Sequence, residues 1–234
     1  MSQLLTVEGM LEFKGYGKIP RLHSPCVVTE KIDGTNGAVV VADVSGLEHW
    51  VPEYATVVTV EAGVFAVAAQ SRHRFISGES DNHGFGAWVR ANAADLAAVL
   101  GPGRHFGEWW GPRIQRGYGV ARRYFSLFDA ARYEAVLDDA AAVWASGRDP
   151  VPPAVAFVLR TAPVLFEGSF TYEDAVTGPL ERLRKGGSVA AFGFARPEGI
   201  VIHWPASGAR AKVTLDGDGP KSVSGMVVPV PRVA

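Results

Sequence analysis

The stretch Glu30-Lys31-Ile32-Asp33-Gly34-Thr35-Asn36-Gly37 decides the interpretation of this sequence. It lies where one apolar, β-branched segment ends and another begins, so it predicts a loop between two strands. A lysine in such a turn can hold its amine toward a cleft, while Gly34 and Gly37 let a ligand approach the backbone closely. An amine attacks phosphorus only in its neutral form, so Lys31 must lose a proton to act as a nucleophile. Taken alone, the stretch also fits a polar hairpin with an Asp-Gly turn.

Short β-branched segments separated by Gly, Pro, Asp or Asn lie on both sides of this stretch. Segments of this kind favour antiparallel hairpins and meanders over a regular parallel sheet. The predicted strands are residues 26–31, 37–44, 56–60, 64–70, 105–110, 124–129, 155–159, 199–204 and 212–215.

Three other segments predict helices. The first follows Asp81-Asn82 and ends before Gly101, and the second covers about residues 131–146. The third opens at Thr171, which has Asp174 three residues later as in a capping box, and it is bent or interrupted at Gly178-Pro179. Many antiparallel strands and three helices outside strict alternation predict an α+β domain.

The length and composition fit one globular domain, with 234 residues of which 47% are hydrophobic and 20% charged. Because the net charge is only −1, any contact with a polynucleotide must come from a local basic patch. The only cysteine, Cys26, cannot form an intramolecular disulfide, which favours a reducing, cytoplasmic setting. No apolar run approaches the ~20 residues of a membrane span. The histidines lack the spacing of a metal site.

Five further motifs follow the Lys31 stretch along the chain. They are Ser71-Arg72, Phe106-Gly107-Glu108-Trp109-Trp110-Gly111, Phe125-Ser126-Leu127-Phe128-Asp129, Glu198-Gly199-Ile200-Val201-Ile202 and Arg210-Ala211-Lys212-Val213. Together with the Lys31 stretch, their order and spacing resemble motifs I, Ia, III, IIIa, IV and V of covalent nucleotidyltransferases. The resemblance covers about residues 31–213 and indicates the RNA ligase 2 type of ATP-dependent RNA ligase.

This resemblance implies an α+β nucleotidyltransferase fold, similar to ATP-grasp domains, in which antiparallel sheets flanked by helices surround a central ATP cleft. It makes Lys31 the nucleophile that attacks the α-phosphorus of ATP and becomes a lysyl-adenylate. Lys212 would neutralise the α-phosphate as charge develops. Arg210 departs from the family pattern, which usually has a second lysine there, and a guanidinium cannot shed its proton as an amine can.

The resemblance also implies how the nucleotide is bound. Glu108 would accept hydrogen bonds from the ribose hydroxyls, and Phe125 would stack on adenine. Glu30 would meet the adenine amino group. Arg72 and Asn36 would steer the ribose, the phosphates or the incoming 5′-phosphate end.

A divalent cation is expected with the ATP. Asp33, Glu198 and Glu108 would hold a hydrated Mg²⁺ or Mn²⁺, because such ions prefer oxygen ligands. Asp33 would also organise the loop that carries Lys31. Taken singly, these carboxylates equally fit the ends of ordinary strands, Phe125 fits a core aromatic, and Arg72 fits a solvated arginine cluster.

The function implied is ATP-dependent joining of 5′-phosphate and 3′-hydroxyl RNA ends, in a nicked duplex or a broken RNA. We expect residues 1–234 to form a single adenylyltransferase domain without a separate OB-type or helical domain after motif V. Substrate capture would then be weaker, or a partner protein would supply it. The basic segments 113–123 and 182–185 are candidates for contact with a phosphate backbone, although a solvated helix face explains the second as well.

Two alternatives stay open at this point. One is a different enzyme with the same chemistry, such as a DNA ligase core, a capping-type guanylyltransferase or an enzyme that only adenylates ends. The other is a non-catalytic nucleotide- or RNA-binding module on the same fold. The presence of Lys31, Glu108, Glu198 and Lys212 favours an enzyme over the binding module.

Overall fold

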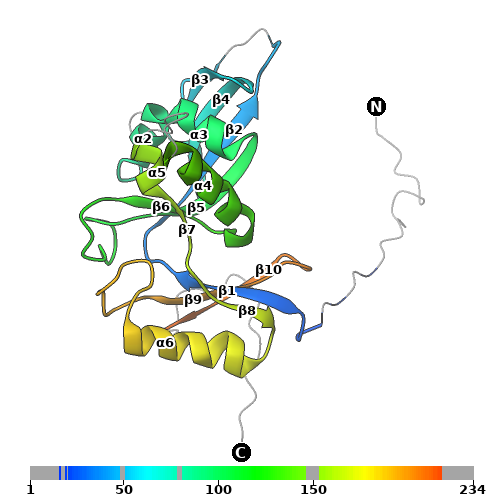
Figure 1. The fold of residues 1–234 in the computed structure, drawn as a ribbon, viewed down its shortest axis with the longest axis vertical. Helices are drawn as coiled ribbons and strands as arrows, with labels where there is room; N and C mark the ends of the chain where they lie inside the picture. Colours follow the sequence, from blue (N-terminus) through cyan, green and yellow to red (C-terminus); the bar gives the residue numbers. More distant parts are fainter. Residues whose placement is uncertain are drawn as a thin grey trace, which may run out of the picture.

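The computed structural model describes residues 16, 19, 21–47, 51–77, 81–145 and 153–217, which form two β-sheets flanked by helices. Figure 1 shows the larger sheet with its helices in the upper part of the molecule and the smaller sheet with one long helix in the lower part. Among these residues, no helix is both long and apolar enough to span a membrane. The arrangement is the predicted α+β architecture.

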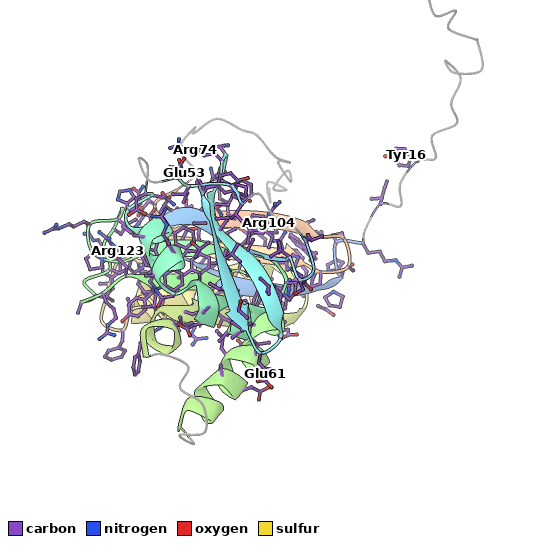
Figure 2. The ribbon with its side chains drawn as sticks, turned by 90° about the horizontal axis from the view of Figure 1, so that it is seen from above. Tyr16, Glu53, Glu61, Arg74, Arg104 and Arg123 are labelled. Atoms are coloured by element: carbon purple, nitrogen blue, oxygen red, sulfur yellow. The ribbon has the colours of Figure 1, made fainter. Side chains whose placement is uncertain are left out.

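The larger sheet has six strands in the order β3-β4-β2-β5-β6-β7. All neighbours are antiparallel except β6 and β7, which are parallel. Its strands are β2 (Thr35–Asp43), β3 (Ala55–Val60), β4 (Gly63–Ser71), β5 (Gly103–Trp110), β6 (Tyr124–Leu127) and β7 (Leu159–Thr161). Figure 2 shows Glu61 at one end of the β3–β4 hairpin, and Glu53 and Arg74 at the other.

One face of this sheet packs against the helices α2 (Phe85–Ala91), α3 (Ala93–Leu100), α4 (Ala130–Ala145) and α5 (Pro153–Val158). Alternate residues of each strand point to this face, because successive side chains of a strand lie on opposite sides. They form the main apolar core with the helices, which includes Val39, Val67, Phe85, Leu96, Trp109, Phe125 and Leu127.

The smaller sheet has four strands in the order β10-β9-β1-β8, all antiparallel. They are β1 (Pro25–Lys31), β8 (Val164–Ser169), β9 (Gly199–Trp204) and β10 (Ala209–Thr214). One face carries Val28, Ile200 and Ile202, which pack against α6 (Gly178–Gly186) and the short π-helix η1 (Glu173–Thr177) that precedes it. The opposite face of this sheet is therefore left for the residues of the predicted site.

The chain passes from the smaller sheet to the larger one at Gly34, between β1 and β2. A Cβ atom at Gly34 would lie 2.5 Å from the carbonyl oxygen of Trp109, so only glycine fits this crossing. A third apolar cluster lies beside the crossing and contains Ile32, Trp110, Tyr118 and Ala191. The crossing places Lys31 at the junction of the two sheets.

Two predicted elements differ from the structure, and two short strands were not predicted. Residues 155–159 were predicted as a strand, but Pro153–Val158 is helix α5, because a short apolar run does not distinguish a buried helix from a strand. The short strands β7 and β8 were not predicted. The first predicted helix is divided into α2 and α3 at Asn92, whose side-chain Nδ2 donates to the carbonyl oxygen of Trp88 at 2.7 Å.

The third predicted helix begins as expected and then changes its winding. Thr171 Oγ1 accepts from the backbone N–H of Asp174 at 3.0 Å, as in a capping box, and donates to its carboxylate at 2.7 Å. The predicted interruption near Gly178-Pro179 takes the form of the π-helical turn Glu173–Thr177 before α6. A π-helical turn is wider than an α-helical one, so it leaves room for the proline ring.

Candidate active site

Lys31 and Glu198 form an ion pair at the junction of the sheets. Lys31 is the last residue of β1, Glu198 directly precedes β9, and Lys31 is in register with Gly199. The distance from Lys31 Nζ to Glu198 Oε2 is 2.5 Å, and both side chains are largely buried. Two sequence-predicted residues that are 167 positions apart are thus brought into direct contact.

Glu108 lies beside this pair on the larger sheet. Its Oε1 accepts from the backbone N–H of Gly34 at 3.1 Å. Burial raises the pKa of Glu108 to about 7, and the nearby charge of Glu198 adds to this effect, whereas Lys31, the Gly34 amide and Arg72 oppose it. The Glu108 carboxyl is therefore poised to change its charge near neutral pH.

Two further cations lie on the same face of the smaller sheet as Lys31. Arg210 and Lys212 belong to β10 and are paired with His203 and Val201 of β9, in alternation with the Ile200 and Ile202 side chains that pack on α6. Both are exposed. The charge of Arg210 helps to lower the pKa of His203, together with burial, which has the larger effect. The face of this sheet opposite α6 is consequently cationic.

Asn36 and Arg72 lie close to Glu108. Asn36 of β2 is directly opposite Glu108 of β5, so their side chains share one face of the sheet. Arg72 directly follows β4, is exposed, and is near enough for its charge to lower the pKa of Glu108. The structure therefore brings Lys31, Glu198, Glu108, Asn36 and Arg72 together at one end of the two sheets.

Phe125 does not join this group. It is fully buried in the main core, 4.9 Å from Phe85 between ring centroids, and it lies on the sheet face opposite to Glu108. This placement argues against the predicted stacking of adenine on Phe125. Phe106 and Phe128 alternate with the core residues of β5 and β6, so they share the Glu108 face, and they are 44% and 39% exposed. The period of two along β6 is the sequence signal that favours Phe128 over Phe125.

The Glu30 side chain lies on the opposite face of β1 from that of Lys31. Its carboxylate is buried and accepts three hydrogen bonds, from Ser188 Oγ at 2.6 Å and from the backbone N–H groups of Val189 at 2.7 Å and Ala190 at 2.9 Å. These donors satisfy the buried charge and hold the loop between α6 and β9 against β1. The arrangement argues against a role for Glu30 in binding the adenine amino group.

The three carboxylates predicted to bind a metal ion are engaged separately. Asp33 Oδ2 accepts from Arg116 Nε at 3.0 Å, whereas Glu198 pairs with Lys31 and Glu108 binds the Gly34 amide. Within the described part of the chain, no three His, Cys, Asp or Glu side chains form a group that could hold a metal ion. The trio Asp33, Glu108 and Glu198 therefore does not form a ready metal site in this arrangement.

The chain also matches a known protein family. A family model described as RNA ligase matches residues 24–214, which contain both sheets and every residue of the predicted site. The chain belongs to the RNA ligase family. The family assignment predicted from the ordered motifs is thus confirmed. A search of curated proteins gives no match.

Solved structures of an RNA ligase from Naegleria gruberi share the fold of this RNA ligase family member. Two variants of that protein with ATP and Mn and one with AMP and Mn each match with a TM-score of 0.50. They are 14%, 13% and 14% identical over 83% of this chain. This chain spans about half of their length, at 50% or 51%. At such identities the similarity shows the fold alone.

Proposed function

We propose that this chain is an ATP-dependent RNA ligase that works through a lysyl-AMP intermediate on Lys31. The observation that carries the proposal is the largely buried Lys31–Glu198 pair beside Glu108, at the junction of the two sheets. Membership of the RNA ligase family supports RNA as the substrate. The ATP and AMP in the structures of the Naegleria gruberi protein support ATP as the nucleotide.

The first step is nucleophilic substitution at the α-phosphorus of ATP. A bond forms between Lys31 Nζ and phosphorus while the bond from phosphorus to the pyrophosphate oxygen breaks, and pyrophosphate leaves with the electron pair. The amine must give up its proton, and Glu198 is a carboxylate acceptor at 2.5 Å. Lys212 offsets the negative charge that develops on the α-phosphate.

The next steps return Lys31 to its starting state. An oxygen of the 5′-phosphate attacks the phosphorus of lysyl-AMP, the phosphorus–nitrogen bond breaks, and Lys31 recovers a proton. The 3′-hydroxyl then attacks the adenylated 5′-phosphate, losing its proton, and AMP leaves. Arg72, exposed at the edge of the site, is suited to guide the 5′-phosphate because a guanidinium binds phosphate with two parallel donors.

A divalent cation, Mg²⁺ or Mn²⁺, is proposed to accompany ATP, supported by the Mn in the Naegleria gruberi structures. It would supply charge neutralisation on the phosphates. Since the predicted carboxylate trio is engaged elsewhere, we assign this ion no set of protein ligands. We further propose that the protein acts in the cytoplasm on nicked or broken RNA, with a partner protein assisting substrate capture.

Transfer of label from [α-³²P]ATP tests the covalent step. The protein is incubated with labelled ATP and Mg²⁺ or Mn²⁺ and separated by denaturing electrophoresis, in parallel with Lys31→Ala. We expect label on the wild-type protein and none on the variant. An unlabelled wild-type protein, or equal label on both, would contradict the mechanism.

The polynucleotide substrate needs a second measurement. Incubation of the labelled protein with nicked RNA, nicked DNA and single-stranded RNA is expected to give sealed product on RNA. Sealing of DNA alone would instead identify a DNA ligase core. Label from GTP but not ATP would identify a capping-type enzyme, and accumulation of adenylated ends without sealing would identify an end-adenylating enzyme.

A further inference from the structure

Arg116 lies in the loop between β5 and β6, within the basic segment considered above for contact with a phosphate backbone. Its side chain is only 22% exposed and is directed into the protein. All three guanidinium nitrogens are used in contacts with this chain's own groups. These contacts indicate a role inside the site.

The contacts reach three separate segments. Arg116 Nε donates to Asp33 Oδ2 at 3.0 Å, and Nη1 donates to the carbonyl oxygens of Arg196 at 3.1 Å and Pro197 at 3.5 Å. Nη2 donates to the carboxylate of Asp216. A planar guanidinium with donors in a fixed fork can serve all three segments at once, whereas a lysine ammonium is a point charge.

Each of these segments carries a residue of the proposed reaction. Asp33 is two residues after Lys31, Pro197 directly precedes Glu198, and Asp216 follows the strand that contains Lys212. The same loop makes a further hydrogen bond to Asp33, since Tyr118 Oη accepts from the Asp33 backbone N–H at 2.8 Å. One loop therefore links the nucleophile, its carboxylate partner and the phosphate-directed cation.

We infer that Arg116 is a positioning residue for adenylation, which holds Lys31 and Glu198 in line for attack on the α-phosphorus. This inference rests on the proposed function. Misplacement of reacting groups by about 1 Å can lower a rate by about 10²-fold. Arg116 touches neither Lys31 nor Glu198 directly, so its effect should fall on the chemical step more than on ATP binding.

The test is the single-turnover rate of Lys31 labelling from [α-³²P]ATP, measured at saturating ATP alongside the equilibrium affinity for ATP. We expect Arg116→Ala to lose about 10²-fold in rate while its affinity for ATP changes less than threefold. The labelling rate of Arg116→Lys should lie between those of the wild-type protein and Arg116→Ala. Arg90→Ala removes an exposed arginine of α2, outside the proposed site, and should label at the wild-type rate.

Two additional measurements separate positioning from a general loss of structure. Guanidinium at low millimolar concentration should restore part of the Arg116→Ala rate, as it would not for an unfolded protein. Asp216→Ala removes one acceptor at a largely exposed position, 69% for the side chain, and should lower the rate several-fold without lowering the melting temperature.

The outcomes are distinct. Labelling of Arg116→Ala at the wild-type rate would overturn the inference. So would a slow Arg116→Ala variant that guanidinium does not rescue, if Asp216→Ala also labels at the wild-type rate. A wild-type protein that forms no label would instead refute the proposed function itself. Partial rescue together with the slower Asp216→Ala variant would support the positioning role.

Discussion

The two sheets present different chemistry at their junction. The smaller sheet contributes cations, with Lys31, Arg210 and Lys212 on the face opposite α6. The larger sheet contributes a carboxylate, an amide and half-exposed aromatic rings, including Glu108 and Phe128. A cationic face suits phosphates, and a face with acceptors and rings suits a nucleoside. Substitutions on the first should therefore change the chemical step, and those on the second nucleotide affinity.

Among variants that keep Lys31, the largest effect is expected for Lys212→Ala. Loss of a cation that offsets charge in the transition state costs about 10²- to 10³-fold in rate. The single-turnover rate of labelling should fall by that factor, with a smaller change in ATP affinity. If affinity for ATP falls while the rate at saturating ATP stays the same, Lys212 binds the ground state and the transition state equally and does not act in the chemical step.

Arg210→Lys is the matched comparison on the same strand. The substitution keeps a positive charge two residues from Lys212, so labelling should stay within about threefold of wild type if charge alone matters at this position. A loss comparable with that of Lys212→Ala would mean that the guanidinium geometry of Arg210 has a specific role.

A pair of aromatic substitutions separates the two faces of the larger sheet. Phe125→Ala removes a fully buried ring from the main core and should lower the free energy of unfolding by about 3–5 kcal/mol. Phe128→Ala, at a half-exposed position on the Glu108 face, should leave stability nearly unchanged. Because base stacking contributes about 1–3 kcal/mol, the loss of the Phe128 ring should weaken ATP binding about tenfold.

Chemical denaturation measures the stability of both variants, and titration with ATP measures their affinity for the nucleotide. The refolded Phe125→Ala variant, assayed at low temperature, should bind ATP with near wild-type affinity. If Phe125→Ala loses affinity while Phe128→Ala retains it, the stacking role predicted from the motif is restored to Phe125.

The difference between these two residues shows what the sequence can and cannot specify. The ordered motifs identify the family and assign Lys31 and Glu198 to one site, and in the structure their side chains lie 2.5 Å apart. Which aromatic side chain shares the Glu108 face depends on the alternation of side chains along β6, and a shift of one residue moves every side chain of a strand to the other face. Motif order does not specify this alternation.

Glu30 and Arg116 illustrate a second limit. Both are polar residues within or beside motifs, so the sequence favours contact with a ligand for each. Their partners include Ser188 and Asp216, which lie outside the motifs and come close only through the packing of loops. Hydrogen bonds between residues this far apart in the sequence leave no local pattern that could predict them. The bond between Thr171 and Asp174 joins residues three positions apart, so the sequence does predict it.

The raised pKa of Glu108 gives a pH test of the larger sheet. The pKa in the folded protein is about 7, against 4.5 for an unperturbed carboxyl, so the folded state holds an extra proton between these values. Stability should therefore fall as pH rises through this interval. Glu108→Gln cannot ionise, and at pH 8 it should be more stable than wild type by about 3 kcal/mol.

Urea denaturation of wild type and Glu108→Gln at pH 5 and pH 8 checks this sign. The advantage of the variant should be small at pH 5 and larger at pH 8. A difference that does not depend on pH would mean that burial does not raise the Glu108 pKa. At pH 8, labelling from ATP should fall in the variant, because an amide is a weaker acceptor for ribose hydroxyls than a carboxylate.

The smallest effect is expected on the far side of the smaller sheet. Thr171→Ala removes the side chain that accepts the Asp174 N–H and begins the helical segment ending in α6, so it should cost about 1 kcal/mol of stability. Labelling of Lys31 should keep its wild-type rate, since α6 packs against Ile200 and Ile202, whereas Lys31 lies on the opposite face. Thermal unfolding and single-turnover labelling measure the two quantities separately. A slower rate at unchanged stability would mean that the α6 face of the sheet is coupled to the cationic face, and the separation of the two faces would then fail.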